Sequence, residues 1–478
     1  MTVKTILGGT AAVGTAMTAL CAGPELLWDT ELISEMTGGA KLVLHHPEFR
    51  EIAIVHDAPW EGNVCCYHTV LYDGKKYRMY YRGMASHLPG YDKHEVTCYA
   101  ESDDGICWVK PKLGICEFGG SRENNIILIE DDASHNFSPC IDTNPDCPPD
   151  QRFKALGGVK KGLYLFHSAD GIHWTKSREE PVITQGAFDS QNTIFYDSVR
   201  KCYVAYSRLS RKGKNGMMLR AIQRQTSPDA IRWSEPEMLD FGETAPDVEL
   251  YTNAIHPYWF NPSVYIGLPK RFTRERASVY DHSGGGGLPG VSDGLFMSSR
   301  DGIRFHRWDE AFVRPGLQHG RWVNRNNMSA QGVVPTKPFL EGAPPELSIY
   351  STEGYYGDGP NKLRRLAIRQ DGFVSVQAPM SGGAFTMKVL AVDGPMLLLN
   401  ASTSGAGEIR CEIRDERNVP IDGYTLAESI PVFGDEPDLA MKWQGGTSLA
   451  PLAGRRVVLH FELKDADIYS LRFGSTGR

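Results

Sequence analysis

Ser102-Asp103-Asp104-Gly105-Ile106-Cys107-Trp108 is the first copy of a turn motif that occurs five times and has the pattern S-x-D-G-I-x-W. The other copies are SADGIHW at 168–174, SPDAIRW at 227–233, SRDGIRF at 299–305 and a degenerate RQDGF at 369–373. The motif aspartates lie 59 to 72 residues apart, a period that fits a four-stranded sheet with long loops. Asp-Gly favours a tight hairpin turn, and we expect the following aromatic residue to fill the gap between neighbouring sheets. The motif therefore has a structural role.

Two other features repeat in phase with these turns. An asparagine stands near the start of a short apolar strand before each turn, at Asn63, Asn136, Asn192, Asn253 and Asn327. A second β-rich run follows each strand, at 77–83, 152–158, 202–208, 263–272 and 347–355. Strands and turns repeated five times predict a five-bladed β-propeller over residues 26–380.

The turn motif ends near residue 380, and a new series of strands begins. One of them is VVLHFELKDADIYSLRFG at 457–474. We therefore expect residues 381–478 to form a β-sandwich, jelly-roll-like in topology. The expected fold class is all-β.

Composition and motifs exclude several function classes. The 58 acidic and 51 basic residues give a net charge of -7 without long runs of one sign, so we expect no nucleic-acid partner. The body of the chain has no apolar stretch of 18 residues, so we expect no membrane span. Metal and nucleotide motifs such as HExxH, an EF-hand loop or a P-loop are absent, and we expect no metal and no cofactor.

The first residues have the form of a secretory signal. Lys4 precedes a small, apolar run from Thr5 to Ala22, and we expect residues 1–25 to be a leader that directs export to the periplasm or the medium. The alternative is an Ala/Gly-rich leader without targeting meaning. The ten cysteines include no CxxC pair, and we expect mostly buried apolar thiols with one or two disulfides.

Strand order assigns polar residues to a pocket. In a propeller, the start of each innermost strand and the end of the next strand open on the same face, because the two strands are antiparallel. Three carboxylates from different blades are expected there, namely Glu61, Asp189 and Glu249. Cleavage of a glycosidic bond needs one carboxylic acid and one carboxylate, and a third acidic group can raise the pKa of the acid. We assign Glu249 as the acid, and Asp189 or Glu61 as the nucleophile or base.

Further polar and aromatic residues are expected to bind the carbohydrate substrate. They are Trp60, Asn63, Arg82, His135, Asp142, Asn192, Arg208, Asn253, Arg271, Asn327 and Glu353. Several have structural alternatives: Glu61 and Asp189 can cap turns, Glu353 can pair with Arg364 or Arg365, and a lone histidine such as His135 can be held by the core.

With WEGN at 60–63, YRMYYRG at 77–83, the repeated turns and the terminal sandwich, the chain resembles the five-bladed glycoside hydrolases related to families 32 and 43. The resemblance covers roughly residues 26–478. It implies three acidic residues from successive inner strands, which act as nucleophile or base, pKa modulator and acid. The matching residues here are Glu61, Asp189 and Glu249. The family-32 pattern WMNDPNG is absent, and Phe137-Ser138-Pro139 stands where that family has Arg-Asp-Pro.

The expected function is an exported glycosidase acting on poly- or oligosaccharides, with furanosides among the candidate substrates. One alternative is a propeller that binds carbohydrate without catalysis. Another is a glycoside phosphorylase, which uses one carboxylic acid and inorganic phosphate, with Arg82, Arg208 and Arg271 holding the phosphate. A sialidase is a third alternative, but such enzymes need an arginine triad on six blades.

Overall fold

The computed structural model describes residues 23–85, 94–130, 132–277 and 290–476. Residues 1–22 of the expected leader at 1–25 lie outside the described residues. The chain folds into two compact units. One comprises residues 47–337 and 346–368, and the other comprises the described residues 23–46, 338–345 and 369–476.

The first unit is a five-bladed β-propeller, as predicted. Five four-stranded antiparallel sheets form the blades, and their innermost strands contact one another. From the inside outward, blade one contains β5 (Cys66–Tyr72), β6 (Tyr77–Gly83), β7 (Val96–Ser102) and β8 (Ile126–Leu128). Blade two contains β9 (Ser138–Ile141), β10 (Phe153–Gly157), β11 (Tyr164–Ser168) and β12 (Thr175–Lys176). Blade three contains β13 (Thr193–Asp197), β14 (Cys202–Lys212), β15 (Met218–Ser227) and β16 (Glu237–Met238).

Blade four is longer and interrupted. Its main sheet contains β18 (His256–Tyr258), β19 (Asn261–Gly267), β22 (Met297–Ser299) and β23 (His306–Arg307). A three-stranded sheet of β17 (Glu249–Leu250), β20 (Lys270–Thr273) and β21 (Val291–Gly294) adjoins these strands in the sequence. The break lets backbone and side chains near Tyr251 turn away from regular strand geometry.

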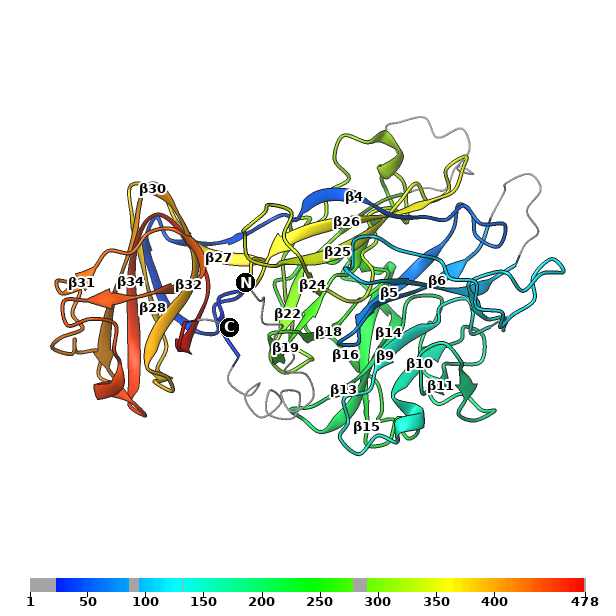
Figure 1. Cartoon of the computed structure of the whole chain (residues 1–478), viewed down its shortest axis with the longest axis horizontal. Helices are drawn as coiled ribbons and strands as arrows, with labels where there is room; N and C mark the ends of the chain where they lie inside the picture. The colour runs from blue at the N-terminus through cyan, green and yellow to red at the C-terminus, as the bar shows by residue number, and fades with distance from the viewer. Residues whose placement is uncertain (1–22, 86–93, 131, 278–289, 477–478) are drawn as a thin grey trace, which may run out of the picture. The chain divides into compact units, whose positions relative to one another are not determined.

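Blade five closes the ring with a strand from the beginning of the propeller. It contains β24 (Val334–Thr336), β25 (Glu346–Glu353), β26 (Lys362–Arg369) and, outermost, β4 (Glu48–Val55). Figure 1 shows β4 in blue beside β26 in yellow, and the two strands pair antiparallel. The first and last parts of the propeller are thus hydrogen-bonded to each other.

In its first four copies the repeated turn joins the third and fourth strands of a blade, and the fifth copy, at 369–373, follows β26. In the first copy, one carboxylate oxygen of Asp104 accepts the backbone N–H groups of Ile106 and Cys107, both at 2.8 Å. The motif aromatic packs against the preceding blade, as Trp174 does edge-on against Tyr80 with ring centroids 6.2 Å apart. The predicted structural role of the motif is confirmed. The motif serines that end β7, β11, β15 and β22 are Ser102, Ser168, Ser227 and Ser299.

The five repeated asparagines are buried and bind backbone groups. The amide of Asn136 donates to the carbonyls of Gly158 (3.0 Å) and Phe188 (2.6 Å) and accepts the N–H of Gly158 at 2.9 Å. These hydrogen bonds satisfy backbone N–H and C=O groups that lie outside the strand pairing. Asn63, Asn192, Asn253 and Asn327 also donate to backbone carbonyls, so their predicted contact with substrate is replaced by a structural role.

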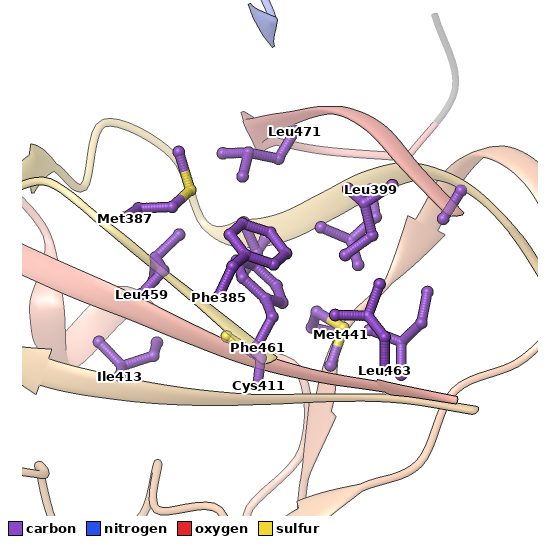
Figure 2. Close-up of a cluster of buried hydrophobic side chains, with 14 of the residues drawn as sticks. Phe385, Met387, Leu399, Cys411, Ile413, Met441, Leu459, Phe461, Leu463 and Leu471 are labelled. Carbon is purple, nitrogen blue, oxygen red and sulfur yellow. The ribbon is translucent and has the colours of Figure 1, made fainter. Parts of the chain in front are cut away.

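The second unit is a β-sandwich. Two long strands, β30 (Met396–Asp415) and β34 (Arg456–Gly474), pair over most of their lengths with a break in register at Thr403. Figure 2 shows its apolar core, in which Phe385 stacks on Phe461 at 4.9 Å. The remaining strands are β1 (Glu25–Leu26), β2 (Ile33–Gly38), β3 (Lys41–Leu44), β27 (Val374–Ala378), β28 (Gly383–Met387), β29 (Leu390–Ala391), β31 (Ser429–Ile430), β32 (Asp435–Ala440) and β33 (Lys442–Trp443).

The domain boundaries differ from those expected at 26–380 and 381–478. Strands β1, β2 and β3 belong to the sandwich, because they pair with β34, β28 and β27. Strand β27 pairs with β34 and also belongs to it. Strand patterns show which residues face a core but not which sheet accepts the strand, so the sequence did not reveal this return of the chain.

The described part of the chain contains only three short 3₁₀ turns as helices, and none could cross a bilayer. All nine cysteines among the described residues are free thiols, so the expected disulfides do not form there. Burial raises the pKa of most of these thiols, which marks them as apolar side chains rather than nucleophiles.

Candidate functional site

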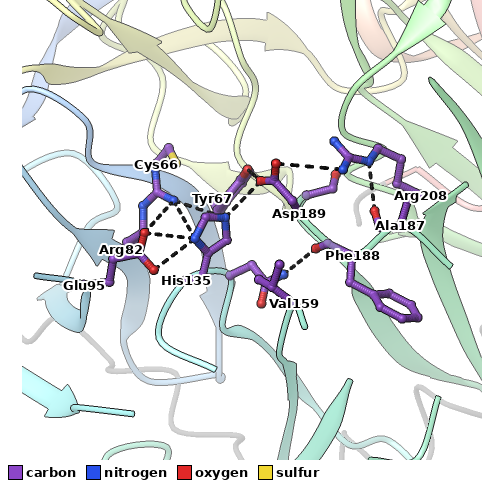
Figure 3. Close-up of polar contacts among 12 residues, drawn as sticks. Cys66, Tyr67, Arg82, Glu95, His135, Val159, Ala187, Phe188, Asp189 and Arg208 are labelled. Carbon is purple, nitrogen blue, oxygen red and sulfur yellow. Dashed lines mark hydrogen bonds and ion pairs between the residues drawn. The ribbon is translucent and has the colours of Figure 1, made fainter. Parts of the chain in front are cut away.

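Side chains from four blades meet around the carboxylate of Asp189, in the segments where the inner strands begin. One oxygen, Oδ1, accepts a hydrogen bond from His135 Nε2 at 3.0 Å and from the hydroxyls of Tyr67 and Tyr251, each at 3.3 Å. The two hydroxyls are 3.0 Å apart. Figure 3 shows Asp189 between His135 and Arg208. Three donors on one oxygen fix the orientation of this carboxylate.

The other oxygen of Asp189 is open. Among the described residues, Oδ2 has only Arg208 Nη2 nearby, at 3.9 Å, and 45% of the side chain is exposed. Burial favours the neutral acid, but the hydrogen bond and charge of His135 and the charges of Arg208 and Arg325 hold the pKa of Asp189 well below its usual range. Asp189 is therefore an oriented, ionised carboxylate that a dissolved molecule can reach.

His135 links Asp189 to a second carboxylate. Its Nδ1 lies 3.0 Å from both oxygens of Glu95, while Nε2 faces Asp189 (Figure 3). Burial lowers the pKa of His135, but the bonds to Asp189 and Glu95 outweigh burial and raise it. His135 thus contacts both carboxylates, and Arg82 Nη1 lies 3.2 Å from its Nδ1, so Asp189, His135 and Glu95 form one coupled unit.

Cations surround the ring of Tyr251. Lys270 Nζ lies 4.1 Å from the ring centroid, and the guanidinium carbons of Arg208, Arg220 and Arg325 lie at 5.2, 5.5 and 5.6 Å. Cations over an aromatic face are favourable, more so when they are shielded from water. The Asp189 cluster, which we define as Tyr67, Glu95, His135, Asp189, Arg208, Tyr251, Lys270 and Arg325, thus combines one open carboxylate with several positive charges.

Unusual backbone geometry positions part of this cluster. Tyr67, Arg325 and Tyr356 have φ values of 55°, 67° and 62°, in the left-handed region that bulky residues rarely adopt. Around Tyr67 the pairing of β5 with β6 shifts register between Cys66 and Thr69. Such conformations cost about 1–3 kcal/mol each and cluster at functional sites. The bulge turns Tyr67 toward Asp189.

Glu61, predicted to be catalytic, lies elsewhere in a buried ion pair. Its side chain is fully buried; it binds Lys110 Nζ at 2.6 Å, the hydroxyl of Tyr81 at 2.5 Å and the N–H of Ala58 at 3.0 Å. Burial opposes ionisation, but His56 and Lys110 lower the pKa of Glu61 to about 2. A carboxylate with no exposed surface cannot contact a dissolved substrate, so the structure gives Glu61 a structural role.

Glu249 was predicted to be the general acid, and its surroundings favour the opposite charge state. It is 5% exposed and pairs with Arg220 at 2.6 Å and with Arg274 at 2.8 Å. Burial raises the pKa of Glu249, but the two arginines outweigh burial and lower it. A general acid needs a raised pKa, so these contacts favour a counterion for the two arginines over the predicted acid role.

The predicted substrate-binding residues divide into two groups. His135 and Arg208 belong to the Asp189 cluster. Arg82 lies behind it, where it donates to the hydroxyl of Tyr355 at 2.9 Å and to the carbonyl of Val64 at 3.1 Å. Arg82 is itself buried, which makes it a support for the cluster rather than a surface that substrate reaches.

The other group is held in contacts that do not involve this cluster. Asp142 is buried and pairs with Lys154 at 2.7 Å. Arg271 forms a two-bond pair with Asp293, at 2.9 and 2.6 Å. Glu353 accepts a hydrogen bond from Arg364 at 2.9 Å, which is the structural pairing that the sequence offered as an alternative to substrate binding. Trp60 donates to Asn125 at 2.7 Å. These side chains stabilise the blades.

Sequence reasoning missed Tyr67, Glu95 and Arg325. Glu95 directly precedes β7, and the third strand of a blade begins at the same end as the first, so strand order could have included it. Tyr67 and Arg325 depend on left-handed backbone that no alternation pattern reveals.

A cavity of about 430 Å³ adjoins β20 and β21. Trp322, Arg276 and Arg314 are among its lining residues, and no residue of the Asp189 cluster lines it. Among the described residues, no three His, Cys, Asp or Glu side chains are grouped as metal ligands.

No protein-family model matches the sequence, and no curated protein matches it. Solved structures share its architecture at low similarity. An N-acetylgalactosamine deacetylase from F. plautii in complex with blood group B trisaccharide is 14% identical, with a TM-score of 0.43 over 68% of this chain and 95% of that one. The Bombyx mori GH32 beta-fructofuranosidase is 12% identical, with a TM-score of 0.40 over 91% and 95%.

A third structure concerns the GH130 family of mannoside phosphorylases, which contains glycoside hydrolases that target beta-1,2 mannosidic linkages in Candida mannan. It is 14% identical, with a TM-score of 0.38 over 67% of this chain and 94% of that one. These similarities concern architecture, so the function has to be inferred from the residues of the Asp189 cluster.

Proposed function

We propose that the Asp189 cluster hydrolyses glycosidic bonds in poly- or oligosaccharides. The observation that carries the proposal is the state of Asp189, whose Oδ1 is held by three donors while Oδ2 is open. An oriented, ionised carboxylate is one of the two groups that the reaction needs, the one that attacks the anomeric carbon or deprotonates the attacking water; the other is an acid that protonates the leaving oxygen.

The charge state of Asp189 favours one of the two carboxylate roles. Because its pKa is held well below the usual range, Asp189 stays ionised at neutral pH and fits a nucleophile or base rather than an acid. His135 and Glu95 support this role, since the imidazole ring between the two carboxylates fixes the Asp189 side chain. Tyr67 of blade one and Tyr251 of blade four complete the support.

The same charge state disfavours phosphorolysis. A phosphorylase with one catalytic carboxyl group needs that group protonated, as the acid that releases the leaving sugar. Of the three arginines first considered for phosphate, Arg82 is buried behind the cluster and Arg271 is paired with Asp293. Hydrolysis is therefore the proposal.

The test measures sugar release by the wild type and by Asp189→Asn, with Asp103→Asn as the control because Asp103 is an exposed turn residue. Aryl furanosides and pyranosides come first, because their leaving groups need little protonation and the described cluster has one open carboxylate. Plant, algal and microbial polysaccharides follow. We expect Asp189→Asn to lose more than about a hundredfold in rate and the control to lose less than twofold.

Each other result has a defined meaning. Equal rates for the wild type and Asp189→Asn would place the chemistry elsewhere. Binding without release by the wild type would indicate a carbohydrate-binding propeller. Release that depends on inorganic phosphate would indicate a phosphorylase.

A further inference from the structure

The positive charges of the Asp189 cluster are only partly balanced. Among the ion pairs of the described residues, Arg220 is matched by Glu249, and Arg208 has only Asp189, at 3.9 Å. No ion pair of the described part of the chain involves Arg325 or Lys270. The cluster therefore has an excess of positive charge beside its open carboxylate.

Arg325 is the clearest unmatched cation. It is half-buried. Among the described residues, its buried Nε has no hydrogen-bond partner, and its one hydrogen bond runs from Nη1 to the hydroxyl of Tyr355 at 3.3 Å. The rings of Tyr251 and Tyr356 lie near its guanidinium, with centroids at 5.6 and 5.5 Å. Asp189 is the carboxylate whose pKa the charge of Arg325 lowers, but the two side chains form no ion pair.

Two observations indicate that Arg325 is held in place for a ligand. Its backbone has a φ of 67°, so the chain adopts an unfavourable conformation at this residue. Neighbouring arginines are paired with acids, as Arg271 is with Asp293 and Arg274 with Glu249. The fold thus pairs these two arginines with carboxylates, whereas no carboxylate of the described residues forms an ion pair with Arg325.

Lys270 reports the same excess of charge. It is fully buried, and Nζ donates to the side-chain oxygen of Asn324 at 3.1 Å. Burial, followed by the charges of Arg325 and Arg220, holds the pKa of Lys270 well below its usual value. A lowered pKa favours the neutral amine, so Arg208 and Arg325, whose guanidinium groups lie near the ring of Tyr251, are the charges that an anion would stabilise.

We propose that Arg208 and Arg325 form a subsite for an oxyanion carried by the sugar itself, so that the substrate is an acidic glycan with a carboxylate or sulfate group. The guanidinium groups supply the planar, forked donors that bind such oxyanions. The position of this subsite next to the reacting carboxylate rests on the proposed function, whereas anion binding does not.

The observations favour a sugar-borne anion over inorganic phosphate. A carboxylate or sulfate carries one negative charge, whereas a phosphate group carries about 1.5 to 2 at neutral pH. Asp189 is ionised and lies 3.9 Å from Arg208, so repulsion by its carboxylate opposes the more highly charged ion. A single negative charge matches the unpaired Arg325.

The experiment compares hexuronic-acid oligosaccharides with their carboxyl-reduced, neutral counterparts by calorimetry, using Asp189→Asn so that no turnover occurs. We expect the acidic form to bind roughly 10- to 100-fold more tightly, the range for a hydrogen bond between charged groups. Sulfated oligosaccharides and their desulfated forms provide a second matched pair. Arg325→Gln should abolish the difference, and Arg325→Lys should retain part of it. Arg232→Gln, at an exposed arginine on another turn, should not change it.

Equal binding of the acidic and neutral forms in both matched pairs would overturn the proposal, as would a difference that Arg325→Gln leaves intact. Competition by millimolar inorganic phosphate at the same residues, without preference for acidic sugars, would also overturn it. If Arg325→Gln does not fold, Arg208→Gln tests the same subsite. If Asp189→Asn keeps full sugar release, the proposed function fails, while the binding comparison in wild-type protein still decides the oxyanion subsite.

Discussion

Replacing Glu61 by glutamine separates a structural carboxylate from a catalytic one. Glutamine keeps the shape of the side chain and removes its charge, which leaves Lys110 Nζ, 2.6 Å away, without its buried partner. We expect the variant to fold less stably and to keep its sugar-releasing activity per folded molecule, because Glu61 has no exposed surface.

The size of the effect follows from the pKa of Glu61, which lies at about 2 against an ordinary 4.5. Each pKa unit is worth about 1.4 kcal/mol, so ionisation of this group stabilises the fold by about 3 kcal/mol at neutral pH. Because the folded-state pKa is lowered, this contribution is present above about pH 4.5 and is lost as the pH falls toward 2. The difference between wild type and variant should shrink over that interval.

The assay is denaturant unfolding of wild type and Glu61→Gln at pH 7 and pH 3, with thermal melting as a second measure. A loss of about 3 kcal/mol corresponds to roughly 3–5 °C in a chain of this size, at about 2.1 cal/mol/K per residue. Asp103→Asn, an exposed turn residue, provides the control. Equal stability at pH 7, or a difference that does not depend on pH, would refute the reasoning. Loss of sugar release at unchanged stability would return Glu61 to the catalytic machinery.

Two further outcomes are expected. Tyr67→Phe removes one of the three hydrogen-bond donors to Asp189 Oδ1. We expect the rate of sugar release to fall about tenfold and the acid limb of the pH–rate profile to move to higher pH. An unchanged profile would contradict a positioning role for Tyr67. Asn136→Ala leaves the carbonyls of Gly158 and Phe188 and the N–H of Gly158 without their hydrogen-bond partner. It should lower the free energy of unfolding by about 1–3 kcal/mol for each of these groups that water cannot reach. Thermal melting against Asn215→Ala, at an exposed asparagine, measures this loss, and equal melting temperatures of the two variants would contradict it.

Much of the propeller was predictable, because its signals are local. The run at 77–83 became β6 (Tyr77–Gly83), and the other four β-rich runs overlap the second strands of their blades. The turns were readable because the bonds that form them join residues two or three positions apart, such as Asp104 and Ile106. Such local patterns predict strands and turns without any knowledge of which distant residues pack against them.

The charged residues were harder, because their partners lie far away in the sequence. Glu61 meets Lys110 and Glu249 meets Arg274, and no spacing rule connects these positions. Strand order correctly brought Asp189 and His135 to one face, where they are hydrogen-bonded. Strand order could not show that arginines would form ion pairs with Glu249, or that a bulge would turn Tyr67 toward Asp189.

The pairing of β4 with β26 also sets an order of events during synthesis. These strands are about 300 residues apart, which at 5–20 residues per second means roughly 15–60 s on the ribosome before β4 can meet its partner. During that interval β4 lacks its partner strand and could pair with another chain. Charged residues such as Glu48, Arg50 and Glu51 reduce this risk of aggregation. A nascent chain that stalls before Lys362 therefore carries an incomplete ring, and chaperone contact is most useful to this protein just before the last blade emerges.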